Sequence, residues 1–188
     1  TSAALLAEAV RRIDERQYVG AEAILNQMLT REPGNPQVCQ LLARLHLQRG
    51  DVQVALGEYR FLAGAALRAH DLTLAESLIQ EFLSADPNSV PLLELNGELL
   101  EEKGDGGGAA IQYAKAIELL LEHPEPGMES LHEELFEKVR SLSSDDAFVN
   151  RLTTRMKRGV SDERSASAQI ASVVSAPLNH VESLPTEG

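Results

Sequence analysis

Cysteine is nearly absent from this 188-residue chain, and its scarcity narrows the chemistry that the chain can perform. The single thiol, Cys39, has no second cysteine with which to form an intrachain disulfide. One thiol also falls short of the paired cysteines of a zinc knuckle, and nothing else indicates an oxidising compartment. We therefore expect a cytoplasmic protein without disulfides.

Aromatic and β-branched residues are also scarce. Tryptophan is missing, aromatic residues make up 4% of the chain, and valine and isoleucine together number 18. Leucine and alanine, by contrast, number 52. Because these two residues favour helices and sheets depend on the residues that are scarce here, the composition predicts an all-α fold.

The sequence also lacks a long hydrophobic run and an export signal. No stretch reaches the roughly 18 apolar residues that a membrane span needs, and the first arginines follow a short apolar stretch, which reverses the order of a secretory signal. We expect a protein that is neither exported nor inserted in a membrane. The chain begins with Thr1 and not with methionine, so a piece of a larger protein is one alternative.

Positive charge is in deficit. The chain has 17 lysines and arginines against 29 aspartates and glutamates, a formal net charge of −12. Nucleic acids and anionic membrane surfaces require clustered cations, so we expect neither as a partner. Residues 94 to 137 carry most of the negative charge, whereas arginines lie nearer the centre of the chain.

A fixed spacing of small and large residues recurs along the chain. A small residue is followed four positions later by a large one, three later by another, and five later by proline. Two segments hold the full spacing: Ala21, Leu25, Met28, Pro33 and Ala75, Ile79, Phe82, Pro87. Two more begin at Ala55 and Ala109 and lack the proline. The anchors Ala21, Ala55 and Ala109 are 34 and 54 residues apart, so a 34-residue unit recurs with one shortened step of 20 residues.

This spacing predicts helix hairpins. An alanine at a helix crossing lets two backbones approach closely, and the large residues beside it fill the interface. Gly50 and Gly104 each precede an aspartate. That order is typical of a helix that ends on a left-handed glycine before the next helix begins on an aspartate cap.

These residues resemble the tetratricopeptide repeat, a helix-turn-helix unit of 34 residues. The resemblance covers about residues 2–123 and implies a right-handed α-solenoid, with repeats near 2–35, 36–69, 56–89 and 90–123 and a capping helix at 128–142. The second and third repeats overlap, because the shortened step makes residues 52–69 one long helix that serves both. We place the end of the solenoid at 143, a short basic helix at 144–159 and a disordered tail at 160–188.

Residues that resemble catalytic or metal sites have simpler structural interpretations. Cys39 and His46 have the spacing of a thiolate and a base on one helix face, but both fall on core positions of the repeat. Glu129 and His132 match half of a di-iron motif that occurs only once here. The glycines of 104–108 fit an inter-helix turn better than a phosphate loop. We expect no catalytic residues, no metal and no cofactor.

The resemblance instead locates function on a surface. In tetratricopeptide arrays the first helices of the repeats line a concave groove in which partner peptides bind. Mapped onto this chain, the groove is polar and cationic in its middle and acidic at its C-terminal end. The residues predicted to bind a partner are Gln37, Gln40, Arg44, Gln48, Arg60, Arg68, Glu94, Glu98 and Glu102.

The sequence therefore predicts a non-enzymatic adaptor or scaffold that presents a peptide-binding groove to a protein partner within a larger assembly. Two alternatives stay open. The first is a self-assembling structural subunit, which forms a homo-oligomer. The second is a regulatory or docking domain of a larger protein.

Overall fold

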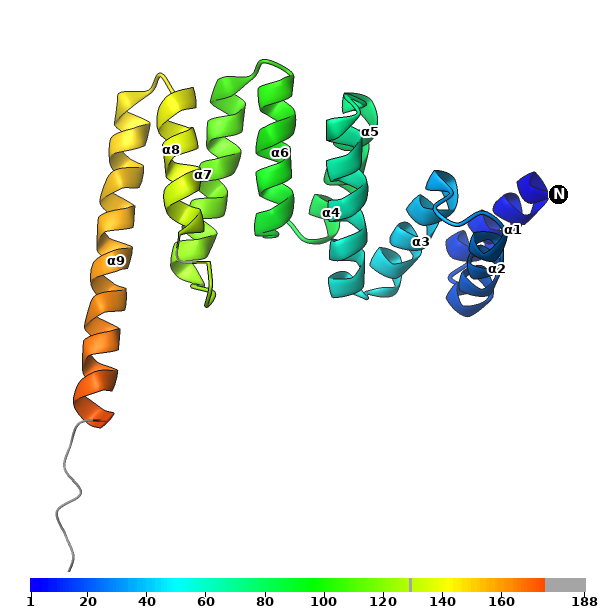
Figure 1. The fold of residues 1–188 in the computed structure, drawn as a ribbon, viewed down its shortest axis with the longest axis horizontal. Coiled ribbons are helices and arrows are strands. Elements are labelled where there is room, and N and C mark those ends of the chain that lie inside the picture. The colour runs from blue at the N-terminus through cyan, green and yellow to red at the C-terminus, as the bar shows by residue number, and fades with distance from the viewer. Residues whose placement is uncertain (129, 175–188) are drawn as a thin grey trace, which may run out of the picture. The chain divides into compact units, whose positions relative to one another are not determined.

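Helices account for all the regular structure of residues 1–128 and 130–174, the part of the chain that the computed structural model describes (Figure 1). They are α1 (Ser2–Asp14), α2 (Tyr18–Arg31), α3 (Pro36–Arg49), α4 (Val52–Arg68), α5 (Leu72–Ala85), α6 (Val90–Glu102), α7 (Gly106–Glu122), α8 (Leu131–Leu142) and α9 (Asp146–Val174). The predicted all-α fold of helix hairpins is confirmed. The chain divides into two units, Thr1–Ser144 and Asp145–Gly188, which are described separately.

Tight turns join neighbouring helices of the first unit. Gly50 ends α3 with a φ of 92°, and Gly104 has a φ of 80° in the turn before α7. His70 takes the same left-handed conformation, with a φ of 59°, between α4 and α5. Asp71 and Asp105 then cap α5 and α7 by accepting backbone hydrogen bonds of 3.1 and 2.8 Å. The turns thus end one helix and start the next within a few residues.

The turn before α4 uses its aspartate differently from the prediction. Asp51 makes no side-chain cap to α4 and instead accepts a hydrogen bond from Arg49 Nε at 2.8 Å. Arg49 Nη1 also donates to Glu22 Oε2 of α2 at 2.7 Å. The arginine therefore ties α2 to the turn between α3 and α4.

The alanines that anchor the repeated spacing lie at buried positions where helices cross. Ala21, Ala55, Ala75 and Ala109 are each 0% exposed. Larger residues pack around Ala21 in one cluster of the first unit and around Ala55 and Ala75 in another. One joins α1, α2 and α3 through Ala9, Ile13, Ala21, Leu25, Met28, Val38, Leu42 and Leu45. The other joins α3 to α6 through Ala43, Ala55, Tyr59, Ala63, Ala66, Leu67, Ala75, Leu78, Ile79, Phe82, Leu92 and Leu99.

The shortened step of the repeat corresponds to α4. This helix runs without a break from Val52 to Arg68 and packs against α3, α5 and α6. Tyr59 on its buried face lies against Phe82 of α5, with 5.5 Å between ring centroids. A single helix therefore stands where two repeats overlap in the sequence.

The helix α8 packs against α7 and buries Leu135 and Val139. It begins at Leu131, later than the predicted start at 128, and Glu129 lies outside the described residues.

In the second unit, the basic helix ends later than the sequence predicts. Its helix α9 continues from Asp146 to Val174, whereas the sequence predicts a helix that ends at 159 and disorder from 160. Serine content suggested disorder, but Ser161 and Ser165 each donate to a carbonyl one turn earlier at 2.9 Å. Such bonds satisfy serine hydroxyls inside a helix, and no proline lies within α9. The remaining part of the predicted tail, 175–188, lies outside the described residues.

Candidate functional site

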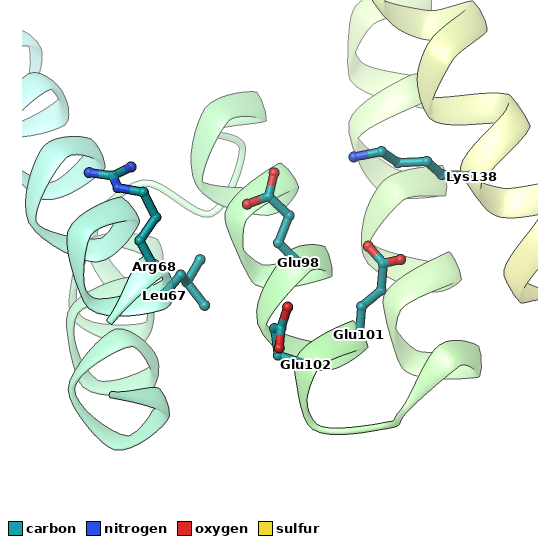
Figure 2. A pocket seen from close by; sticks show the side chains of 6 residues that line it. All are labelled: Leu67, Arg68, Glu98, Glu101, Glu102 and Lys138. Carbon is teal, nitrogen blue, oxygen red and sulfur yellow. The ribbon is translucent and has the colours of Figure 1, made fainter. Parts of the chain in front are cut away.

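A charged pocket of about 370 Å³ opens between α4, α6 and α8 (Figure 2). Its lining combines one leucine with side chains of both charge signs: Leu67, Arg68, Glu98, Glu101, Glu102 and Lys138. Three of the predicted groove residues, Arg68, Glu98 and Glu102, therefore meet at one site. The pocket lies entirely within the first unit.

The helical period places the three acids of the pocket together. Glu101 and Glu102 lie three and four residues after Glu98, so both neighbour it on one side of α6. Arg68 is the last residue of α4, and Lys138 comes from α8. Figure 2 shows the acidic side chains between these two cations. The site is thus an acidic helix face with a positive charge on each side.

Glu98 is an acid of this face that is partly removed from water. Desolvation raises the pKa of this half-buried carboxyl, the nearby Lys138 opposes the rise, and Glu94 and Glu101 add to it. Glu98 is therefore a carboxylate that gains from an additional cation, because its own surroundings do not fully compensate its charge.

Tyr113 of α7 contacts two residues that line the pocket. The buried tyrosine donates a hydrogen bond to Glu101 Oε2, and Lys138 Nζ lies 5.0 Å from the centre of its ring. Burial and this carboxylate raise the pKa of the Tyr113 hydroxyl, so it stays a donor at neutral pH. One buried ring therefore orients both an acid and a cation of the site.

The tyrosine needs a glycine opposite it. A Cβ atom at Gly97 of α6 would lie 2.6 Å from Tyr113 Cζ and 2.8 Å from its Cδ1. Only a residue without a side chain leaves room for the ring at this crossing.

Two polar contacts at the rim involve other residues of this region. His70 Nε2 lies 3.5 Å from Glu102 Oε2, and Lys103 Nζ lies 2.6 Å from Glu76 Oε2. Because these pairs are largely exposed, each contributes little stability. They leave Glu98 and Glu101 as the acids that face Lys138 across the pocket.

Arg44 belongs to a second polar cluster. Its Nε lies 2.9 Å from Glu81 Oε1 of α5, and the hydroxyl of Tyr59 donates to the same oxygen at 2.7 Å. The Glu81 carboxylate raises the pKa of the Arg44 guanidinium. Burial raises the pKa of the Tyr59 hydroxyl, and the hydrogen bond to Glu81 adds to this rise. Arg44 thus bridges α3 and α5.

The other predicted groove residues do not line this pocket. Gln37 and Gln48 are exposed on α3 and Gln40 is half-buried there, while Arg60 is exposed on α4 and Glu94 is half-buried on α6. Lys138 was not among the predicted groove residues, because it lies on the capping helix and outside the repeats. A signal was available: Lys138 directly follows the acidic stretch that ends at Glu137.

Cys39 and His46 only partly fill the core positions predicted for them. Both are half-buried, and the buried residues of α3 are Val38, Leu42, Ala43 and Leu45. His46 is a polar bridge: its Nδ1 lies 2.5 Å from Glu58 Oε1 and its Nε2 lies 3.8 Å from Glu22 Oε1.

In the part of the chain that the structure describes, no three His, Cys, Asp or Glu side chains are grouped so that they could hold a metal. None of the helices formed by residues 1–128 and 130–174 combines the length and hydrophobicity needed to cross a bilayer.

Stacked hairpins with alanine crossings and glycine or aspartate turns define an α-solenoid built from helix-turn-helix units. Residues 12–58, which extend from α1 to α4, match the family model of the tetratricopeptide repeat. This match confirms the predicted resemblance over residues 12–58. Comparison with the sequences of curated proteins gives no match.

Several solved structures are similar to this chain. A crystal structure of MamA is 13% identical, with 85% of this chain and 96% of that chain covered and a TM-score of 0.43. A second MamA structure is 11% identical, with 98% of each chain covered and a TM-score of 0.43. TTC0263, a thermophilic TPR protein of Thermus thermophilus, is 18% identical, with coverages of 83% and 99% and a TM-score of 0.33. The resemblance to the tetratricopeptide repeat rests on the matched segment and the repeat spacing.

Proposed function

We propose that the chain is a non-enzymatic scaffold that binds an extended segment of a partner protein along α4 and α6. The observation that carries this proposal is the acidic face of α6 held between Arg68 and Lys138. A repeat array of this kind offers a surface for protein partners in general. The charged pocket is the feature that gives this surface its selectivity.

The pocket suits a segment with charges of both signs. A lysine or arginine of the partner would lie against Glu98 and Glu101, where a new cation compensates a half-buried carboxylate. A carboxylate of the partner would accept hydrogen bonds from Arg68 or Lys138, which are the donors at the two sides. Opposite charges at fixed positions favour one orientation of the segment.

The remaining predicted residues extend this surface toward the N-terminus. Gln37, Gln40 and Gln48 offer amide groups on α3, and Arg60 offers a guanidinium on α4. Arg44 has a structural ion pair with Glu81, so we assign it to the stability of the groove wall. Arg68 is therefore the better arginine on which to test binding.

A peptide-display library provides the probe for this proposal. Peptides selected on the full chain are synthesised, and their affinities are measured for the wild type, Arg68→Glu and Glu98→Lys. We expect each reversal to weaken binding about ten- to a hundredfold, since a charged hydrogen bond contributes roughly 1.5–3 kcal/mol. The losses should shrink at high salt, because partly exposed charges are screened.

Two control variants match these changes. Arg31→Glu reverses an exposed arginine in the last turn of α2, as Arg68→Glu does in α4. Glu118→Lys reverses an exposed glutamate on α7. Both should bind the selected peptides like the wild type. Equal affinity of the peptides for Arg68→Glu, Glu98→Lys and the wild type would show that the pocket is not the binding site.

A further inference from the structure

The exposed side of α4 carries an apolar strip. Phe61 is 69% exposed and Val54, seven residues earlier, is 55% exposed. Seven residues are two helical turns, so these side chains and Arg68 follow one line along the helix. The strip ends at the arginine that lines the charged pocket.

This strip is separate from the face that packs in the core. α4 buries Ala55, Tyr59, Ala63, Ala66 and Leu67 against its neighbours. On the opposite side, a Cβ atom at Gly57 would meet nothing within 4 Å, and one at Gly64 would meet only Arg68 Nη1 at 3.3 Å. Within the first unit, Thr1–Ser144, the apolar side chains of the strip stay largely exposed.

The surroundings of Phe61 distinguish it from an ordinary exposed apolar residue. Arg60 and Arg68 are both exposed, one beside Phe61 and one two turns farther along. Aromatic and arginine side chains are the types that dominate binding energy at protein interfaces, where a buried aromatic anchor is surrounded by polar contacts. Two arginines at this place also form a cationic island in a chain of net charge −12.

We propose that this strip docks a segment of a partner protein in which an aromatic or long aliphatic side chain packs on Phe61 and an acidic side chain binds Arg68. The proposal rests on the proposed function and specifies the chemistry of the partner. Phe61 and Arg68 are roughly 10 Å apart along the helix, at about 1.5 Å per residue. An extended partner covers that distance in about three residues.

Charge argues for this occupant over two others. A second copy of the chain would bring another −12 to the surface, so long-range repulsion opposes self-association there. Nucleic acid needs more cations than two arginines beside an acidic helix can provide. An acidic side chain next to an apolar one is complementary to the strip itself.

Differential selection from the display library tests the proposal. The library is selected in parallel on the wild type, on Phe61→Ala and on Val19→Ala, whose native side chain is an 82% exposed valine of α2. We expect peptides that are enriched on the wild type and on Val19→Ala and lost on Phe61→Ala. Their shared feature should be an apolar side chain about three residues from an aspartate or glutamate.

The affinities of the enriched peptides give the quantitative test. Phe61→Ala should weaken them about ten- to a hundredfold, because full burial of a phenylalanine shifts an equilibrium constant by roughly one to two powers of ten. Phe61→Leu should retain most of the affinity, since it keeps apolar bulk. Unchanged helicity and denaturation midpoint would show that Phe61→Ala folds normally.

The outcomes separate this inference from the proposed function. Peptides that are lost on Glu98→Lys but bind Phe61→Ala normally would overturn the docking strip and leave the pocket assignment intact. Failure to enrich any peptide would count against both. Concentration-dependent self-association that disappears in Phe61→Ala would identify a second copy as the occupant and overturn the proposed chemistry.

Discussion

Replacement of Gly97 and Gly57 by alanine should change stability in opposite directions, although both glycines lie inside helices. In a helix interior, alanine is favoured over glycine by about 1 kcal/mol. The two sites differ in what the added methyl group meets. At Gly57 a Cβ atom has nothing within 4 Å, whereas at Gly97 it lies less than 3.0 Å from three atoms of the Tyr113 ring.

The size of the Gly97 effect follows from how firmly Tyr113 is held. The ring is 0% exposed, its hydroxyl donates to Glu101, and Lys138 lies over its face. Relief of the clash requires the ring or α6 to move by about 1 Å, and such overpacking typically costs about 1–3 kcal/mol. After the helix-propensity gain is subtracted, we expect Gly97→Ala to lower the free energy of unfolding by up to about 2 kcal/mol.

Urea denaturation followed by circular dichroism measures both variants against the wild type. Gly57→Ala should raise the midpoint, with a gain of up to about 1 kcal/mol. Gly97→Ala should lower it and should also weaken peptide binding, because Tyr113 positions Glu101 and Lys138. If Gly97→Ala raises the midpoint as Gly57→Ala does, the close crossing of α6 and α7 is refuted.

Two further predictions concern the polar groups of the first unit. Tyr59→Phe removes the hydroxyl that donates to Glu81 and should cost about 1 kcal/mol of unfolding free energy in the same assay, while no loss would mean that the hydrogen bond contributes nothing. Glu98→Gln should raise the midpoint at neutral pH and match the wild type at acid pH. The sign follows from the raised pKa of Glu98 in the folded protein. Protonated Glu98 favours the folded state fully below the pKa that this carboxyl has in the unfolded chain, and this contribution is lost as pH rises through its pKa in the folded protein. A difference that is independent of pH would contradict this account.

The hairpins could be predicted from the sequence because their determinants are local and repeated. The anchors Ala21, Ala55, Ala75 and Ala109 share one spacing, and all four are fully buried. The shortened step of the repeat leaves too few residues for another helix, and the structure has one continuous helix, α4, in this segment. The spacing of residues predicts the hairpins here because each repeat contacts mainly its neighbours.

The site was only partly predictable because it depends on how separate helices approach one another. The acids of α6 and Arg68 followed from the repeat register, but Lys138 enters the pocket only because α8 packs on α7. Arg44 was expected to face a partner, whereas a carboxylate of α5 lies within 2.9 Å of it. That ion pair depends on the position of α5 after the shortened step, which spacing alone does not give.

The end of α9 was mispredicted for a different reason. Composition averages over a segment, and the serines of 160–174 lowered the expectation of order. In the structure, serine hydroxyls of this helix bond to backbone carbonyls of the preceding turn. A polar composition is compatible with a helix when the hydroxyls are satisfied locally and no proline interrupts it.

The two binding features proposed here depend differently on distance and salt. The acidic surface of residues 94–137 acts over a range of about 10 Å at 0.1 M salt, so it attracts basic partners in general and accelerates their approach. Contact with Phe61 acts only at touching distance and is insensitive to salt. A partner that carries only basic residues would therefore associate quickly and dissociate quickly, and its affinity would collapse as salt rises. A partner that also places an apolar and an acidic side chain on α4 would keep much of its affinity, since the slow step of its dissociation is the release of Phe61.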